Sequence, residues 1–182
     1  FLVSRVEDAS ALADAGITVR ARVGAPAGRH ASAAENLLGP QILGLDASRP
    51  TTPALRLTAE IIAVKRVGAD RGVSYGYTYR TERPSTLVLV ALGYADGILR
   101  VASNKAPVLV GETTGRITGR IAMDQFVVDI GDAGAATGDP VVLFGDPARG
   151  EPTATDWEAA LGVAAPVITS RLGRRIERVY TP

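Results

Sequence analysis

The feature that most constrains the fold is a series of short, β-branched apolar runs that begins after residue 54. Each run is bounded by Gly, Asp, Asn or Pro, which favour turns. We expect strands over residues 55–67, 87–91, 108–110, 116–121, 126–130, 140–144 and 176–180, the first half-buried and the last closing the sheet. Such strands are typical of an antiparallel barrel or sandwich. The sequence therefore predicts a mainly β domain over residues 55–182.

Helical patterns occur near the two ends of the chain. Residues 1–16 resemble a short strand followed by a helix, and residues 20–53, rich in Gly and Pro, indicate a connector. The clearest helix is predicted over residues 155–161, with Thr153 or Thr155 as its N-cap and Gly162 as its end. The expected plan is a short α/β appendage over residues 1–54, then the β domain with one late helix.

Composition excludes several classes of function. The 182 residues carry a net charge of +1 and no basic run, so neither nucleic acid nor a membrane surface is an expected partner. No apolar stretch is long enough to predict a transmembrane helix. The chain lacks Cys, which is compatible with a cytoplasmic location, and its only histidine, His30, lies in a loop-like segment. We therefore expect no metal site and no serine–histidine triad.

A tyrosine-rich segment is the first motif that could carry chemistry. Tyr75, Tyr77 and Tyr79 alternate along the chain, so on a strand all three would lie on one face. An aromatic stripe of this kind commonly packs on a core or at an interface. The segment alone leaves a structural and a functional interpretation open.

Two further motifs follow. Gly-Tyr-Ala-Asp-Gly at 93–97 contains an Asp-Gly pair typical of a hairpin turn, while Gly93 would let the backbone approach another group closely. In Gly-Arg-Ile-Ala-Met-Asp-Gln at 119–125, Arg120 and Asp124 would share one face of a strand. Taken alone, that pair predicts only a surface ion pair, worth at most about 1 kcal/mol.

In this order and spacing, the motifs resemble the C-terminal domain of the pyridoxal-phosphate-dependent alanine racemases. The resemblance runs from about Leu55 to Tyr180. Its anchors are Val-Ser-Tyr-Gly-x-Thr-Tyr at 73–79, the motifs at 93–97 and 119–125, and Gly-Asp-x-Val at 138–141. The resemblance implies a Greek-key β-barrel, which agrees with the strand prediction made from the residues.

The resemblance also implies roles for five residues. Tyr75 matches the catalytic tyrosine that moves a proton on one face of the substrate α-carbon, and Tyr94 and Met123 match residues at the substrate end of the site. Arg100 and Arg120 match residues of the entrance corridor. In the family, the C-terminal domain of one subunit reaches the cofactor of the other. A tyrosine acts as a base only where its phenolate is stabilised by neighbouring cations or dipoles.

The cofactor-binding part of the family pattern is not matched. The family holds pyridoxal phosphate on a lysine of an N-terminal barrel, but Lys65 and Lys105 lie outside that motif. Only residues 1–17 and 39–46 resemble pieces of this barrel. The family's phosphate-binding tyrosine is also missing from residues 162–167. We therefore expect this chain alone neither to bind the cofactor nor to racemise alanine.

Three functional hypotheses follow. Because most of the barrel is missing, the face that bears Tyr75, Tyr77, Tyr94 and Met123 should be partly exposed. An exposed face of this composition predicts a homodimer, or pairing with a pyridoxal-phosphate barrel subunit. The substrate that the resemblance implies is a small amino acid. Alternatively, the chain is a non-catalytic binding or regulatory module that uses this face. An enzyme of another mechanism is disfavoured by the single histidine and two lysines.

Overall fold

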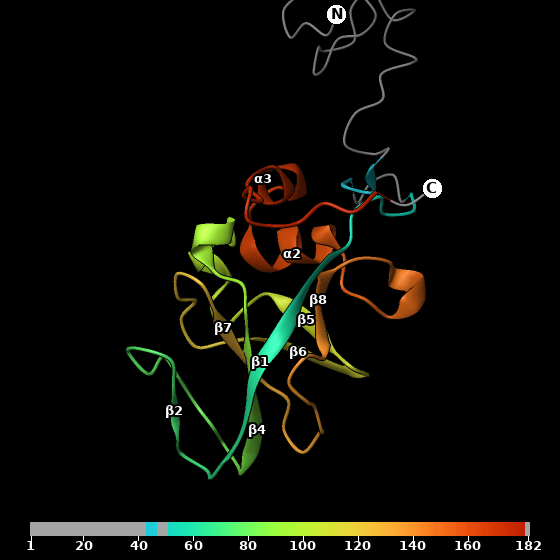
Figure 1. Cartoon of the computed structure of the whole chain (residues 1–182). Helices are drawn as coiled ribbons and strands as arrows, with labels where there is room; N and C mark the ends of the chain where they lie inside the picture. Colours follow the sequence, from blue (N-terminus) through green and yellow to red (C-terminus); the bar gives the residue numbers. More distant parts are fainter. Residues whose placement is uncertain (1–42, 47–50, 181–182) are drawn as a thin grey trace, which may run out of the picture.

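Six strands close into an antiparallel β-barrel in the computed structural model, which describes residues 43–46 and 51–180 (Figure 1). The order around the barrel is β1-β4-β7-β6-β5-β8, and β8 returns to β1. The strands are β1 (Leu57–Val67), β4 (Ser85–Val90), β5 (Pro107–Val110), β6 (Thr113–Thr118), β7 (Phe126–Asp129) and β8 (Pro140–Phe144). The mainly β fold and the barrel predicted from the sequence are confirmed.

The long strand β1 belongs to two halves of the barrel. Its first residues pair with β8 and the later ones pair with β4, with register shifts at Leu57/Thr58 and between Ile61 and Ala63. The expected half-buried alternation holds only over the first half of this strand: Leu57 and Ile61 are buried and Ala59 is half-buried, whereas residues 62–66 are all exposed. The alternation stops at the register shift between Ile61 and Ala63, where a bulge interrupts the pairing of β1 with β4.

The barrel is closed by β8, and the predicted closing strand at residues 176–180 is wrong. β8 pairs with both β1 and β5. Residues 176–180 form no strand, and Val179 and Tyr180 are exposed. The Arg178 guanidinium instead donates to backbone carbonyls upstream in the same tail. In a closed barrel every strand already has two partners, so no edge is left for a further strand.

Helix α2 (Ala154–Leu161) lies at one end of the barrel (Figure 1). It begins with a capping box, in which the Thr153 side chain accepts from the Asp156 amide at 3.0 Å and Asp156 accepts from the Thr153 amide at 2.7 Å. Trp157 is fully buried, packs edge-on against Phe144 and donates from Nε1 to the Pro107 carbonyl at 2.8 Å. The predicted helix, its Thr153 cap and its end at Gly162 are confirmed.

A second late helix, α3 (Ala165–Ser170), was not expected from the sequence. Its six residues are too few for a periodic pattern, and Gly162 and Pro166 suggest a loop. Pro166 is tolerated because it lies in the first turn, where its missing N–H leaves no hydrogen bond unmade. Ala165 donates its amide to Glu158 at 2.7 Å, which ties α3 to α2. The chain therefore has two short late helices rather than one.

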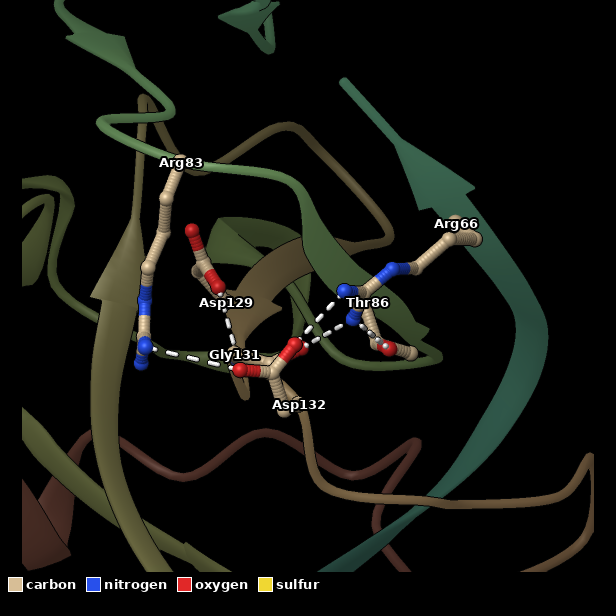
Figure 2. A network of polar contacts seen from close by, with 6 residues as sticks. All are labelled: Arg66, Arg83, Thr86, Asp129, Gly131 and Asp132. Carbon is tan, nitrogen blue, oxygen red and sulfur yellow. Dashed lines mark hydrogen bonds and ion pairs between the residues drawn. The ribbon is translucent and has the colours of Figure 1, made fainter. Parts of the chain in front are cut away.

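A polar network ties β1 and β4 to the loop after β7 (Figure 2). Arg66 donates to Thr86, to the Gly131 carbonyl and to Asp132, and Arg83 approaches Asp132 from another side. The Arg66 hydrogen bond and charge lower the pKa of Asp132. The network holds three neighbouring strands of the barrel together at the surface.

Several predictions fall outside the residues that the structure describes. They are the strand–helix unit at 1–16, most of the connector at 20–53, His30, and the first half of the piece at 39–46. The division at residue 54 therefore stays a prediction. Within residues 43–46 and 51–180, no helix has the length and apolar character needed to cross a bilayer.

Candidate functional site

The tyrosine-rich segment forms the tip of a hairpin outside the barrel. Strands β2 (Gly72–Val73) and β3 (Tyr79–Arg80) pair with each other, and residues 74–78 turn between them. The backbone φ is positive at Ser74, Gly76 and Tyr77, at 58°, 75° and 44°. These left-handed positions reverse the chain. The prediction that the three tyrosines share one face of a strand is therefore wrong.

Each tyrosine of this segment has its own surroundings. Tyr77 is 65% exposed, and its ring covers Gly72, where a Cβ would overlap it. Tyr79 donates to Asp129 Oδ2 at 2.8 Å. Partial burial, then the hydrogen bond to Asp129 and its negative charge, raise the pKa of Tyr79 to about 12. Of the three tyrosines, Tyr75 is the one in contact with Arg100 and with residues of the motif at 119–125.

Tyr75 is held between two arginines and a backbone carbonyl. Its hydroxyl donates to the Ile121 carbonyl at 2.9 Å and accepts from Arg100 Nη2 at 3.1 Å. The Arg120 guanidinium carbon lies 5.8 Å from the ring centroid, close enough for a cation–π contact. Gly76 permits this packing, because a Cβ there would lie 2.9 Å from Arg120 Nη1. The oxygen of Tyr75 is thus fixed in position, while 45% of the side chain stays exposed.

The Gly-Tyr-Ala-Asp-Gly segment packs backbone to backbone on the loop that carries Met123. The amides of Tyr94 and Ala95 donate to the carbonyls of Ala122 and Met123 at 3.1 and 2.9 Å. A Cβ at Gly93 would overlap the Met123 carbonyl, so the close approach expected at this glycine is confirmed. The hairpin turn expected from Asp-Gly is wrong, because residues 94–96 form a 3₁₀ turn, η3 (Tyr94–Asp96), that Gly97 ends in the left-handed region.

Arg120 and Asp124 do not pair, contrary to expectation. Strand β6 ends at Thr118 and β7 begins at Phe126, so both residues lie in a loop and do not share a strand face. The Arg120 carbonyl accepts from Ser74 Oγ at 2.6 Å, while the Asp124 carboxylate pairs with Arg175 at 2.8 Å. No local pattern points to Arg175, because its two carboxylate partners lie at least 51 positions earlier in the chain.

Arg100 joins the parts of the site. It begins the 3₁₀ turn η4 (Arg100–Ala102), donates to Tyr75 Oη and lies over the Tyr94 ring, 5.5 Å from its centroid. After this turn, Asn104 donates to Thr78 of the hairpin and accepts from the Gly119 amide. Ser103 accepts from the Ile121 amide of the loop that carries Met123. The structure therefore gathers the five residues predicted from the sequence. We call them the site face: Tyr75, Tyr94, Arg100, Arg120 and Met123.

Neither lysine of the sequence is a member of the site face. Lys65 is an exposed residue of β1 and lines an open cleft of about 830 Å³ between β1, β4 and the β2–β3 hairpin. No residue of the site face lines that cleft. Lys105 is exposed in the turn after η4. Over residues 43–46 and 51–180, no group of three or more His, Asp or Glu side chains could hold a metal ion.

Comparison with known proteins identifies the family. Residues 54–180 match the family model described as "Alanine racemase, C-terminal domain". The alanine racemase of Thermobifida fusca (strain YX) is 51% identical over 129 residues, which are 71% of this chain and 34% of that protein. The site face thus lies in a domain with close relatives among alanine racemases.

Solved structures agree with the sequence matches. The alanine racemase from D-cycloserine-producing Streptomyces lavendulae superposes with a TM-score of 0.74 at 47% identity, over 78% of this chain and 39% of that one. The alanine racemase from Bartonella henselae with covalently bound pyridoxal phosphate gives a TM-score of 0.69 at 28% identity, over 77% and 40%. The chain belongs to the alanine racemase family, through its C-terminal domain. It spans about a third of the length of the curated relatives it matches.

Proposed function

We propose that this domain supplies the catalytic tyrosine and the substrate-entrance residues to a pyridoxal-phosphate site on a partner barrel, where alanine is racemised. The observation that carries the proposal is the site face itself. Three segments far apart in sequence converge there, and they fix the Tyr75 hydroxyl between Arg100 and the Ile121 carbonyl on an exposed surface. Proton transfer to an external substrate requires a hydroxyl that is held in position on a residue that a partner surface can reach.

In this proposal, Tyr75 Oη exchanges a proton with the α-carbon of the amino acid. Arg100 already donates to that oxygen, and a hydrogen bond from a cation strengthens as negative charge develops on its acceptor. Arg120 adds a second positive charge near the ring. Tyr94 and Met123 bound the space beside the substrate, and the two arginines line its entrance. Their partly exposed side chains support these roles, because a partner surface can reach them.

The cofactor has to come from another part of the assembly. In the described residues the Tyr75 hydroxyl is hydrogen-bonded to the Ile121 carbonyl and to Arg100 and not to either lysine, so no proton-transfer step is assigned to Lys65 or Lys105. In the relative from Bartonella henselae, pyridoxal phosphate is bound covalently. That group makes the α-hydrogen of an amino acid acidic. Pairing with a cofactor-bearing barrel, and a cytoplasmic location, remain parts of the proposal.

A chimaeric enzyme tests the proposed function. Residues 54–180 would replace the matching region of the Thermobifida fusca racemase, which keeps its own barrel. We expect the chimaera to racemise alanine and Tyr75→Phe to reduce kcat at least about 100-fold, the typical contribution of a general base. Tyr77→Phe is the matched control, because Tyr77 is 65% exposed and lies outside the site face.

The alternative function, a non-catalytic binding module, predicts a different result. A folded, cofactor-loaded chimaera without racemase activity, or with equal activity in the wild type and Tyr75→Phe, would contradict the catalytic proposal. Retained activity in Tyr77→Phe together with loss in Tyr75→Phe would exclude an effect of tyrosine content alone.

A further inference from the structure

We propose that Arg175 is a positioning residue that clamps the loop of Tyr94 to the loop of Met123. Arg175 lies in the tail after α3, outside every motif that the sequence singled out. Among the described residues, Arg175 forms its ion pairs with Asp96 and Asp124 and none with a site-face side chain, so it would act through the two loops. Its effect on racemisation rests on the proposed function, whereas its effect on the loops does not.

The clamp consists of two ion pairs made by a single guanidinium. Arg175 Nε lies 3.1 Å from Asp96 Oδ1, and Arg175 Nη1 lies 2.8 Å from Asp124 Oδ1. Asp96 ends η3, two residues after Tyr94, and Asp124 directly follows Met123. One side chain therefore bridges the two segments that bound the proposed substrate space.

The two halves of the clamp differ in strength. The Asp124 side chain is 56% exposed, and an exposed ion pair contributes little. The Asp96 side chain is only 6% exposed, and its other oxygen accepts from the Gly93 amide at 2.8 Å. A buried carboxylate that loses its cation keeps its desolvation cost uncompensated. The contact with Asp96 should therefore dominate the effect of removing Arg175.

The tail that carries Arg175 is itself seated on the Tyr94 segment. The Gly173 amide donates to the Asp96 carbonyl at 2.7 Å. Gly97, with φ of 104°, leaves no room for a side chain, because a Cβ there would overlap the Arg171 carbonyl. These backbone contacts place the tail beside the Tyr94 loop, and the Arg175 guanidinium pairs there with both Asp96 and Asp124. The tail is thus built to hold both loops in one arrangement.

Amide hydrogen exchange in the 182-residue chain tests the clamp without cofactor or partner. The reporters are the amides of Tyr94 and Ala95, which donate across the junction of the two loops. We expect Arg175→Gln to accelerate their exchange at least about tenfold, while the Val88 amide in β4 changes less than about twofold. Arg174→Gln is the matched control, because Arg174 is exposed and no ion pair or side-chain hydrogen bond of it is found in the described chain.

Two further variants and a second reporter sharpen the test. Arg175→Lys keeps the charge but cannot hold two carboxylates with one planar group, so its exchange should be intermediate. Asp124→Asn should give a smaller acceleration than Arg175→Gln, and it still tests the clamp if Arg175→Gln fails to fold.

Met123 is the only methionine of the sequence, so a ¹³C-methyl label, assigned with Met123→Leu, reports on its loop. Equal exchange rates and methyl shifts in Arg175→Gln and Arg174→Gln would overturn the proposal.

The catalytic consequence is measured separately in the chimaera. Arg175→Gln should lower kcat/KM for alanine about tenfold, mainly through KM, because Tyr94 and Met123 bound the substrate space. Arg175→Lys should restore part of this loss. If the wild-type chimaera is inactive while exchange still responds to Arg175, the proposed function fails and the clamp stands. If the chimaera is active and neither exchange nor KM responds, the clamp fails and the proposed function stands.

Discussion

At the scale of single residues, neighbouring tyrosines of one motif serve different purposes. The Tyr79 hydroxyl donates to Asp129 in strand β7, whereas the Tyr75 hydroxyl accepts from Arg100 and donates to the Ile121 carbonyl. Left-handed backbone at Ser74, Gly76 and Tyr77 separates them. Residue type alone therefore does not distinguish the structural tyrosine from the catalytic candidate, but the partner of each hydroxyl does.

Removing the Tyr75 hydroxyl should affect stability little. The side chain is 45% exposed, so Tyr75→Phe should lower the free energy of unfolding by only about 0.5–1 kcal/mol, the net value of an ordinary hydrogen bond. Urea unfolding measures this difference. A loss above about 2 kcal/mol would show that the hydroxyl is mainly structural.

Tyr79 should make the fold sensitive to alkaline pH. Its pKa rises from 10.0 to about 12 in the folded chain, first because of burial and then because of the bond to Asp129. Between these values the unfolded chain loses the phenolic proton while the folded chain keeps it, so the free energy of unfolding falls as pH rises. Tyr79→Phe should flatten this fall in urea titrations from about pH 9 to about pH 11.

The control for this prediction is Tyr180→Phe, because Tyr180 is 89% exposed. Its pH profile should follow that of the wild type. The same alkaline slope in the wild type and in Tyr79→Phe would contradict the assigned cause.

At the scale of elements, the N-terminal cap of α2 is the clearest structural feature that depends only on residues close together in the sequence. Thr153 and Asp156 satisfy each other's amides, and Trp157 in the following turn closes the barrel end. Thr153→Ala removes one acceptor for an amide at the helix start and should cost about 1 kcal/mol. Thermal unfolding measures the loss, with Thr155→Ala as the comparison. An equal or larger loss in Thr155→Ala would place the cap at Thr155 instead.

The elements also show what the sequence could and could not predict. Strands and α2 were predictable, because β-branched runs, turn residues and a cap act locally. The closing strand at 176–180 was wrong, because the pairing of β8 with β1 depends on contacts far apart in sequence. The resemblance to a known family identified the five site-face residues, but the sequence did not predict which groups each of them contacts. Arg175 could not be found, since only the folded tail brings it to Asp96 and Asp124.

At the scale of the whole molecule, the exposed site face predicts association. Tyr75, Tyr94 and Met123 are 45%, 37% and 53% exposed beside two arginines, a composition that is typical of interface cores. We expect a homodimer through the β domain, with Met123→Asp in the site face weakening it. Sedimentation at increasing concentration measures this. A monomer at about 100 μM would contradict the homodimer, since specific dimers of standard interface size form below that concentration.

In the proposed function, Tyr75 acts on one face of the substrate α-carbon. Exchange of the α-hydrogen in deuterated water, followed separately for L-alanine and D-alanine in the chimaera, measures this directly. Tyr75→Phe should slow the exchange of one enantiomer at least about 100-fold and leave the other within about tenfold, because a different group serves the opposite face. Equal slowing of both enantiomers, or slowing of neither, would contradict the role assigned to Tyr75.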